Sequence, residues 1–273
     1  MKRITSRHNP LVARYRAIAR GDVHDLLLLD GAHLVGEALE ARVRVQQVAV
    51  AADAPADVMA LADTLRSAGI DVVAATASVM GALSPVRSSS AFVAIAERPV
   101  GAVDALDAGP RAALVVVASG VQDPGNLGAI VRVAEAGGAT AVIAAGGSAD
   151  PYGWKALRGS MGSALRLPII SGLDTAAALA DLRRRGYRIV ATVPRGGRSM
   201  FNADFRAATA VVIGAEGVGL DPAIVTRADE RVTIPMERPV ESLNAAVTVA
   251  LVVYEALRQR TAVGSRQPAA GRK

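Results

Sequence analysis

Three short segments of the chain combine glycine with polar side chains that could bind a ligand. Each follows an apolar stretch, and their sequences are DPGNLGAIVR (123–132), IGAEGVGLD (213–221) and IPMERPVESLN (234–244). Glycine at the end of a strand lets the backbone approach a ligand closely, and α/β proteins usually hold nucleotide-like ligands at such strand ends. The three segments therefore predict a ligand site.

The residue types in these segments restrict the kind of ligand. Gly125 and Gly128 do not give the G-x-G-x-x-G dinucleotide fingerprint, and no Lys-Ser or Lys-Thr pair follows to complete a phosphate-binding loop. Glu216 lies inside the second glycine loop, where its charge would repel a pyrophosphate. A ligand with adenosine character and without phosphates fits better. Each segment alone also has a purely structural interpretation, since glycines end strands and Ser242 could be an ordinary helix N-cap.

Length and composition predict two domains with mainly aliphatic cores. The chain has 273 residues, of which 51% are hydrophobic and only 3% aromatic, and this balance suits helices packed on a parallel sheet. It has no cysteine, which excludes disulfides, thiolate metal sites and a cysteine nucleophile. The three histidines, His8, His24 and His33, are scattered, so we expect no metal site.

The positive charge is concentrated at the two ends of the chain. The net charge is +6, from 31 basic and 25 acidic residues. The first twenty residues contain six Lys or Arg, and the residues after Glu255 contain five, with no acid in either segment. The rest of the chain is therefore net negative. Basic ends indicate an anionic polymer as partner, although a solvated and partly disordered tail also fits the final segment, TAVGSRQPAAGRK.

The N-terminal segment is amphipathic and does not resemble a secretory signal. It has no continuous apolar region, although its Arg-rich, acid-poor character alternatively fits a transit peptide. No segment reaches transmembrane length, so we expect a cytoplasmic protein that does not bind membranes. After Pro10 the pattern predicts a helix that presents Arg16 and Arg20 away from its apolar side. That apolar side consists of Leu11, Val12, Tyr15, Ile18 and Ala19.

Alternating strand-like and helix-like segments predict two α/β domains. We expect a small domain over residues 1–98, a linker rich in Pro and Gly over 99–110, a catalytic domain over 111–260 and a flexible basic tail over 261–273. In the first domain the strand-like and helix-like segments are 25–30, 32–41, 43–52, 56–70, 71–77 and 89–97. In the second, the expected strands are 112–119, 140–146, 187–193, 209–214 and 231–235, and the expected helices are 126–138, 154–163, 175–186 and 242–260.

Taken together, the three glycine-containing segments resemble a known set of motifs. In order, spacing and residue type they match the three signature motifs of the SpoU (TrmH) family of RNA ribose 2'-O-methyltransferases. The N-terminal stretches ITSRHNPLVARYR and GAHLVGEALEA are also similar to the RNA-binding domain of the ribosomal-RNA branch of that family, which includes thiostrepton-resistance methyltransferases. The resemblance covers nearly the whole chain.

The departures from the family pattern are modest. The first motif more often continues R-T-A than the R-V-A found here, and the third usually has glycine where Arg238 or Pro239 stands, and Val-Ser after Asn244 where this chain has Ala-Ala. None of these changes removes a candidate catalytic side chain. They leave the substrate subgroup open, so a transfer RNA substrate stays an alternative to ribosomal RNA.

The resemblance implies a fold, a cofactor and partners. The expected fold is α/β, with a parallel-sheet catalytic domain whose C-terminal segment forms a deep trefoil knot of the SPOUT type, an exception to the rule against threaded chains. A small α/β RNA-binding domain precedes it. The implied cofactor is S-adenosylmethionine, the implied substrate is RNA, and the implied assembly is a homodimer with a composite site, built largely on the apolar face of the helix over 242–260.

The resemblance also implies roles for particular residues. Asn126 would hold the ribose or a phosphate of the RNA, Ser242 and Asn244 would orient their loop and a guanidinium, and Glu216 would fix that arrangement. Together with Arg132 these are the candidate catalytic residues. The candidate cofactor-binding residues are Thr192, Gly214, Ile234 and Leu243, and the candidate RNA-binding residues are Arg3, Arg7, Arg14 and Arg16.

Arg132 needs separate treatment, because the family precedent makes it the group that activates the 2'-hydroxyl. A guanidinium whose pKa exceeds about 12 is a poor general base. We therefore expect Arg132 to act electrostatically, by lowering the pKa of the hydroxyl and stabilising the developing alkoxide, while a phosphate or water takes the proton. A purely structural ion pair of Arg132 with Glu135 or Asp123 is the alternative.

Two other function classes compete with an RNA methyltransferase. A nicotinamide-dependent reductase would share the α/β alternation, but it should have the dinucleotide fingerprint and an acid about twenty residues further on, and the chain offers neither cleanly. A non-catalytic RNA-binding relative would keep the basic N-terminal segment and lose polar motif residues, whereas all five are present here.

Overall fold

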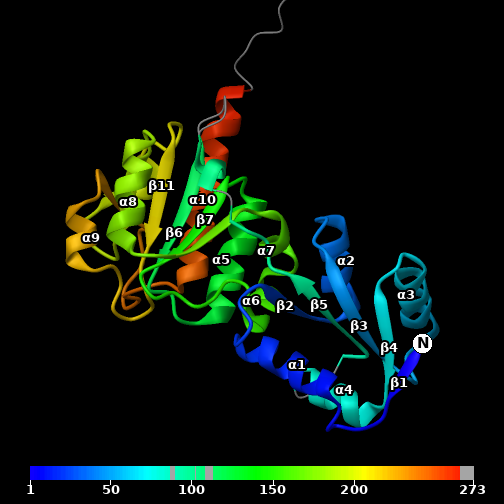
Figure 1. Ribbon diagram of the computed structural model, residues 1–273. Coiled ribbons are helices and arrows are strands. Elements are labelled where there is room, and N and C mark those ends of the chain that lie inside the picture. The colour runs from blue at the N-terminus through cyan, green and yellow to red at the C-terminus, as the bar shows by residue number, and fades with distance from the viewer. Residues whose placement is uncertain (87–89, 102, 108–112, 265–273) are drawn as a thin grey trace, which may run out of the picture. The chain divides into compact units, whose positions relative to one another are not determined.

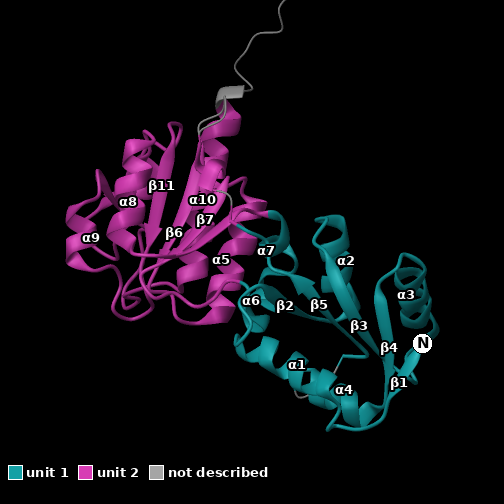
Figure 2. Ribbon diagram, viewed as in Figure 1, with its two compact units in different colours: residues 1–100, 152–166 teal, residues 101–151, 167–273 magenta. Residues whose placement is uncertain are grey.

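The computed structural model describes residues 1–86, 90–101, 103–107 and 113–264, and the chain forms two compact units (Figures 1 and 2). Unit 1 contains residues 1–100 and 152–166, and unit 2 contains residues 101–151 and 167–273. The sequence predicts a first domain that ends at residue 98, close to the end of the first stretch of unit 1. It does not predict that residues 152–166 pack with this unit.

Unit 1 is built on a five-stranded mixed sheet in the order β1-β4-β3-β5-β2. The pairs β1–β4 and β3–β4 are parallel, whereas β3–β5 and β2–β5 are antiparallel. β2 is therefore an edge strand. The strands are β1 (Lys2–Ile4), β2 (Leu26–Asp30), β3 (Val45–Ala51), β4 (Asp71–Ala75) and β5 (Phe92–Glu97).

Helices cover both faces of this sheet. α1 and α4 pack against each other and against the strands, and α2 and α3 also contact strands. Side chains of α1 and α4 share one buried cluster with alternate strand residues such as Leu28, Val73 and Ile95. The helices are α1 (Pro10–Arg20), α2 (Ala32–Glu40), α3 (Ala56–Ser67), α4 (Ala77–Leu83), α6 (Trp154–Ser160) and α7 (Ser163–Arg166).

The predicted N-terminal helix is confirmed as α1. The Asn9 side chain caps it by accepting from the Leu11 amide, Pro10 occupies its first turn, and Gly21 ends it with φ 82°. Its buried residues, Val12, Tyr15 and Ile18, belong to the predicted apolar side.

Residues 152–166 pack on unit 1 through α6, which lies against the edge strand β2. The Arg166 guanidinium forms an ion pair with Glu37 on α2. Gly162 passes so close to the Glu37 side chain that no Cβ would fit there. A helix that the sequence assigns to the second domain therefore completes the first unit.

Unit 2 is built on a seven-stranded sheet in which every described pairing is parallel, in the order β10-β12-β9-β11-β6-β7-β8. This confirms the predicted α/β class and the parallel catalytic sheet. The strands are β6 (Leu114–Ser119), β7 (Ala141–Ala145), β8 (Ile169–Leu173), β9 (Arg188–Thr192), β10 (Arg198–Ser199), β11 (Thr209–Ile213) and β12 (Glu230–Thr233).

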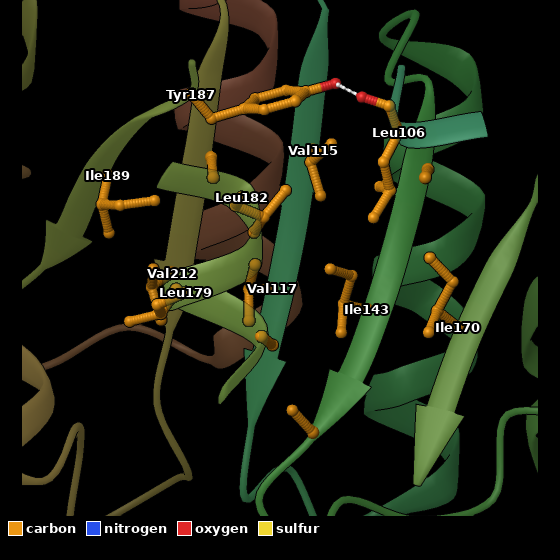
Figure 3. Close-up of a cluster of buried hydrophobic side chains, with 14 of the residues drawn as sticks. Leu106, Val115, Val117, Ile143, Ile170, Leu179, Leu182, Tyr187, Ile189 and Val212 are labelled. Carbon is orange, nitrogen blue, oxygen red and sulfur yellow. Dashed lines mark hydrogen bonds between the residues drawn. The ribbon is translucent and has the colours of Figure 1, made fainter. Parts of the chain in front are cut away.

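Two layers of helices enclose this sheet. On one face Val117, Ile143 and Val212 pack against Leu179 and Leu182 of α8 (Figure 3). Alternate strand residues point to the other face, where α10 packs against α5 and β11. The helices are α5 (Pro124–Ala136), α8 (Thr175–Arg184), α9 (Pro222–Thr226) and α10 (Ala245–Gly264), with short 3-10 turns η1 (Val103–Leu106) and η2 (Met200–Asn202).

Part of the predicted linker belongs to the core of unit 2. Leu106 is buried in the cluster on the α8 face, and the Tyr187 hydroxyl donates to its carbonyl oxygen at 2.8 Å (Figure 3). Burial, the largest effect, raises the pKa of Tyr187. Residues 102 and 108–110 of that linker, and residues 265–273 of the predicted basic tail, lie outside the described residues.

The C-terminal end of α10 is held by a dense polar network. Gln259 donates to the Ala203 carbonyl and accepts from the Phe205 amide, each at 2.8 Å. Arg260 donates to the carbonyl oxygens of Phe205 (2.7 Å), Ala207 (3.0 Å) and Ala113 (3.4 Å). These bonds fix the helix to the segments that precede β6 and β11. The helix continues to Gly264, beyond its predicted end at residue 260.

Candidate active site

A pocket of about 360 Å3 lies at the carboxyl ends of β9, β11 and β12 in unit 2. This is the edge where ligands bind in open parallel sheets, and the volume falls within the range of small-molecule sites. The walls come from the ends of these strands, from the glycine loop after β11 and from the segment that leads into α10. All four candidate cofactor-binding residues line it: Thr192, Gly214, Ile234 and Leu243.

The glycine loop after β11 forms one wall and has a tight turn. The Val218 amide donates to the Glu216 carbonyl at 3.0 Å, and the Gly219 amide donates to the Ala215 carbonyl at 2.9 Å. A Cβ on Gly214 would lie 2.2 Å from the backbone carbon of Gly219. Only glycine fits at position 214, because the loop folds back over it.

Three of the five candidate catalytic residues form one hydrogen-bond network beside this pocket. The Asn244 Nδ2 donates to Asn126 Oδ1 at 2.9 Å and to Glu216 Oε1 at 2.7 Å. Each of these residues belongs to a different motif segment. The structure thus brings the three segments to one place, as the sequence predicts.

The orientation of the Asn244 amide is fixed by the helix that it caps. Its Oδ1 accepts from the backbone amides of Ala246 at 2.9 Å and Val247 at 3.2 Å, so Asn244 is the N-cap of α10. Its Nδ2 must then point toward Asn126 and Glu216. Because Asn126 accepts through Oδ1, its own Nδ2 group faces away from the Asn244 amide, and no partner for it is found among the described residues. The network therefore presents an amide donor to a ligand.

Asn126 is itself fixed by the start of α5. The Asp123 side chain accepts from the Asn126 backbone amide at 2.7 Å and caps this helix, and Pro124 occupies its first turn. The first motif is thus a capped helix start directly after β6, which places Asn126 near the edge of the sheet.

Ser242 and Arg132 take up different positions from those of the network residues. Ser242 is exposed and lines the pocket, but α10 begins at Ala245, so the possible N-cap role of Ser242 is wrong and belongs to Asn244. Arg132 is exposed on α5, six residues and about 9 Å along the helix from Asn126. The alternative ion pair of Arg132 with Glu135 or Asp123 is absent from the described part of the chain. Among the described residues, Arg132 therefore has no ion-pair or hydrogen-bond partner and is not bonded to the network.

Sequence reasoning missed several pocket residues, among them Thr248 and Met236. Thr248 lies one turn after Asn244 on α10, and Met236 lies in the third motif segment. A threonine one turn into an otherwise apolar helix was the available signal for the first. Nothing in the sequence distinguishes Met236 from an ordinary apolar loop residue.

The described residues contain neither a candidate metal site nor a candidate membrane-spanning helix. No group of three or more His, Asp or Glu in the described ranges is arranged to hold a metal ion. Within the same ranges, no helix has both the length and the apolar character needed to cross a membrane.

Comparison with known proteins extends these observations. The model of the SpoU rRNA Methylase family matches residues 113–254. A 23S rRNA (guanosine-2'-O-)-methyltransferase of Ralstonia nicotianae is 32% identical, with 94% of this chain and 98% of the relative covered.

Two solved structures are also similar over almost the whole chain. The SpoU methyltransferase AviRb from Streptomyces viridochromogenes, in complex with AdoMet, has a TM-score of 0.83 and 28% identity and covers 93% of this chain and 99% of its own. An AdoMet-bound rRNA methyltransferase from Sinorhizobium meliloti has a TM-score of 0.82 and 27% identity, with 94% and 97% covered.

Proposed function

Because the chain belongs to the SpoU rRNA Methylase family, we propose that it transfers a methyl group from S-adenosylmethionine to a ribose 2'-hydroxyl of ribosomal RNA. The observation that carries this proposal is that one hydrogen-bond network joins all three motif segments beside a pocket that the second and third segments line. The Ralstonia relative is named for the same reaction on 23S rRNA. Ribosomal RNA is therefore the proposed substrate class.

The pocket fits the adenosine part of S-adenosylmethionine. Ile234, Met236 and Leu243 give apolar walls, and the tight glycine loop that begins at Gly214 contributes backbone to the wall between them. The absence of a Lys or Arg among the pocket residues suits an adenosine without phosphates. When bound here, the cofactor supplies a methyl group activated by its positive sulfur.

Asn126 is proposed to hold the RNA beside the methyl donor. Its Nδ2 group has no partner among the described residues and can donate to a ribose or phosphate oxygen. Asn244 and Glu216 act as positioning residues, because they fix which way the Asn126 amide faces. Ser242, exposed on the pocket wall, is proposed to orient the loop that closes on the ligand.

Arg132 is proposed to lower the pKa of the target 2'-hydroxyl and to stabilise the alkoxide that forms as the methyl group arrives. Its lack of an ion pair within the described chain supports this role, since its charge is not already neutralised. A phosphate of the RNA or a water molecule then takes the proton, because a guanidinium is too weak a base.

Unit 1 is proposed to bind the RNA backbone. Arg3, Arg7, Arg14 and Arg16 are all exposed, and none of them forms an ion pair among the described residues. Unneutralised arginines release counterions when they meet phosphates, which makes binding favourable and dependent on salt.

A homodimer with a composite site is proposed as the working form. Val247, Leu251 and Tyr254 follow one another at helical spacing on α10 and are 47%, 39% and 51% exposed. Such an apolar stripe favours burial against a second copy. Leu251→Asp should convert the dimer into a monomer in light scattering at micromolar concentration, whereas Arg184→Asp on α8 should not. A fully active monomeric wild type would contradict the dimer.

Two further features are proposed from family membership. The chain is inferred to form a trefoil knot in unit 2, which is consistent with the place of β11 between β6 and β9 and with the return of α10 onto α5. The site of action is inferred to be the cytoplasm, where bacterial ribosomal RNA is modified.

The direct test is methyl transfer by the purified protein. With S-adenosylmethionine and ribosomal RNA, digestion to nucleosides followed by mass spectrometry should detect a 2'-O-methylated nucleoside, and excess EDTA should leave the rate unchanged. Transfer RNA tested alongside separates the alternative substrate. No methyl transfer to either RNA would support the non-catalytic alternative. Mapping 2'-O-methylation in total RNA from a deletion strain would identify the modified nucleotide.

A further inference from the structure

The two helical faces of unit 1 differ in charge. α1 and α4 contain no Asp or Glu, and neither do the residues that precede α1. α2 and α3 carry Glu37, Glu40, Asp57 and Asp63. A phosphate chain would therefore meet less repulsion at the surface formed by α1 and α4.

Two arginines on this surface are fixed by the same helix. The Arg7 Nε donates to the Ser78 carbonyl oxygen at 2.9 Å, and the Arg16 Nε donates to the Ala82 carbonyl oxygen at 3.1 Å. Ser78 and Ala82 lie one turn apart on α4. Both arginine side chains are thus anchored to one helix, although Arg7 precedes α1 and Arg16 lies on α1 itself. α1 and α4 pack side by side (Figure 1).

The way in which these arginines are bonded leaves their binding groups free. Each uses only Nε, so both terminal nitrogens of each guanidinium have no hydrogen-bond or ion-pair partner among the described residues. Terminal guanidinium nitrogens form two-pronged bonds with phosphate oxygens. The two anchoring carbonyls are separated by about 6 Å along α4, so two forks are presented side by side.

The surface of α4 beside the two forks is unusually open. Its exposed positions are Ala77, Ser78 and Gly81, and a Cβ on Gly81 would meet nothing within 4 Å. Glycine inside a helix costs about 1 kcal/mol relative to alanine. No packing demand explains Gly81, whereas close approach of another backbone would.

We propose that Arg7 and Arg16, anchored on α4, form a two-phosphate clamp that holds successive phosphates of an RNA strand. This inference rests on the proposed function and refines it, because the other two candidate arginines differ. Arg14 donates through Nη2 to Gln46 at 2.9 Å, and the Gln46 amide donates to Glu97, so Arg14 lies closer to an acidic group. Arg3 is exposed and has no bond that fixes it among the described residues.

The experiment measures RNA affinity against salt for matched pairs of variants. The probe is a fluorescein-labelled single-stranded RNA of mixed sequence, followed by fluorescence anisotropy. The clamp pair Arg7→Gln with Arg16→Gln should weaken binding about tenfold or more at low salt and reduce the slope of log Kd against log salt by about 1.4. The control pair Arg44→Gln with Arg66→Gln removes the same charge from exposed arginines already paired with Glu97 and Asp63. It should leave the slope close to that of the wild type.

A second set of variants separates the fork geometry from charge and from folding. Arg7→Lys with Arg16→Lys keeps both charges, so the salt slope should stay near that of the wild type while affinity still falls several-fold. Gly81→Ala should raise the thermal stability of the protein and weaken RNA binding. If the lysine pair and the Gly81→Ala variant both bind RNA with wild-type affinity, then neither two-pronged guanidinium bonding nor close approach of the RNA backbone to α4 contributes, and the clamp is wrong.

Methyl transfer is measured in parallel so that the two proposals fail separately. If the clamp pair binds RNA with wild-type affinity and slope, the clamp is wrong and the proposed function stands. If the wild type transfers no methyl group but the clamp pair reduces the slope of log Kd against log salt, the proposed function is wrong and the clamp stands. If wild-type binding does not depend on salt, the clamp is overturned, and the methyl-transfer assay alone decides the proposed function. Unchanged melting temperatures and S-adenosylmethionine affinities exclude a general loss of structure.

Discussion

The two ends of helix α10 carry polar networks of different kinds. At its N-terminal end, Asn244 orients Asn126, whose Nδ2 group has no partner among the described residues. At its C-terminal end, Glu255, Arg258, Gln259 and Arg260 are joined to one another or to backbone groups. Unused hydrogen-bonding capacity marks the end that meets ligands, whereas saturated capacity marks the end that holds the fold.

This contrast predicts the largest effect at Arg132, which shares the unused character of Asn126. Arg132→Ala should lower the turnover number by about a hundredfold or more, because the developing alkoxide loses its cation. Single-turnover methyl transfer with saturating RNA measures it. The affinities for RNA and S-adenosylmethionine should change little. The control Arg184→Ala removes an exposed arginine paired within α8 and should be fully active. A normal rate for the Arg132 variant would make the assigned role wrong.

The next largest effect is expected at the saturated end. Arg260→Met removes one donor from each of three carbonyl oxygens. The oxygens of Ala113 and Ala207 still accept from Thr209, whereas that of Phe205 loses its donor, so the substitution should cost about 1 to 3 kcal/mol in the free energy of unfolding. Urea unfolding measures this loss. Cofactor affinity of the folded variant should stay unchanged, because Arg260 lies at the other end of the helix from the pocket. A change of stability below about 0.5 kcal/mol would show that the contrast between the two ends does not hold.

A smaller effect, at the N-terminal end of α10, distinguishes the role of Asn244 as a helix cap from its role in orienting Asn126. Asn244→Ser keeps a good helix N-cap, so stability should fall by only a few tenths of a kcal/mol. The serine cannot reach both Asn126 and Glu216, and the rate of methyl transfer should fall by about tenfold because Asn126 is no longer held. Asn244→Ala, which removes the cap as well, should lose about 1 kcal/mol more. Equal rates of methyl transfer for the wild type and the serine variant would show that Asn244 acts only as a helix cap.

The smallest effect concerns the pH dependence of stability. The hydrogen bond from Arg258, the largest cause, holds the pKa of Glu255 below its ordinary value of 4.5. A carboxylate with a lowered pKa contributes stability above its ordinary value and loses it as the pH falls through the lowered one. The wild type should therefore be more stable than the Glu255→Gln variant at pH 7, and this difference in stability should shrink as the pH drops below about 4.5. Thermal melts between pH 7 and 3 measure it. In an Arg258→Gln background the same substitution should have less effect at pH 7.

Much of the site could be predicted because its residues carry their own local signals. Glycine and polar residues directly after apolar segments identified the pocket, and Thr192, Gly214, Ile234 and Leu243 all line it. The choice between Ser242 and Asn244 as the cap could not be predicted. Both are good caps two residues apart, and long-range bonds to Asn126 and Glu216 decide between them.

The fold was predictable where elements are long and periodic. The edge strand β1 has three residues and is defined by its pairing with β4, in which Lys2 lies opposite Val73, so no local sequence pattern predicts it. β8 is an edge strand in which only Ile169 and Ile170 are buried, and it was missed for the same reason. The predicted helix over 154–163 is broken at Met161, whose left-handed φ of 50° separates α6 from α7.

The packing of α6 against β2 has a consequence for biosynthesis. β2 is complete once residue 30 has been made, but the helix that packs against it begins at Trp154. At about 5 to 20 residues per second, the ribosome needs some 3 to 10 s to travel from residue 100 to residue 152. During that interval the nascent chain carries an edge strand without its helix, and such edges can pair with other chains. The emerging chain is therefore most exposed to misassembly, and most dependent on chaperones, while its middle third is being translated.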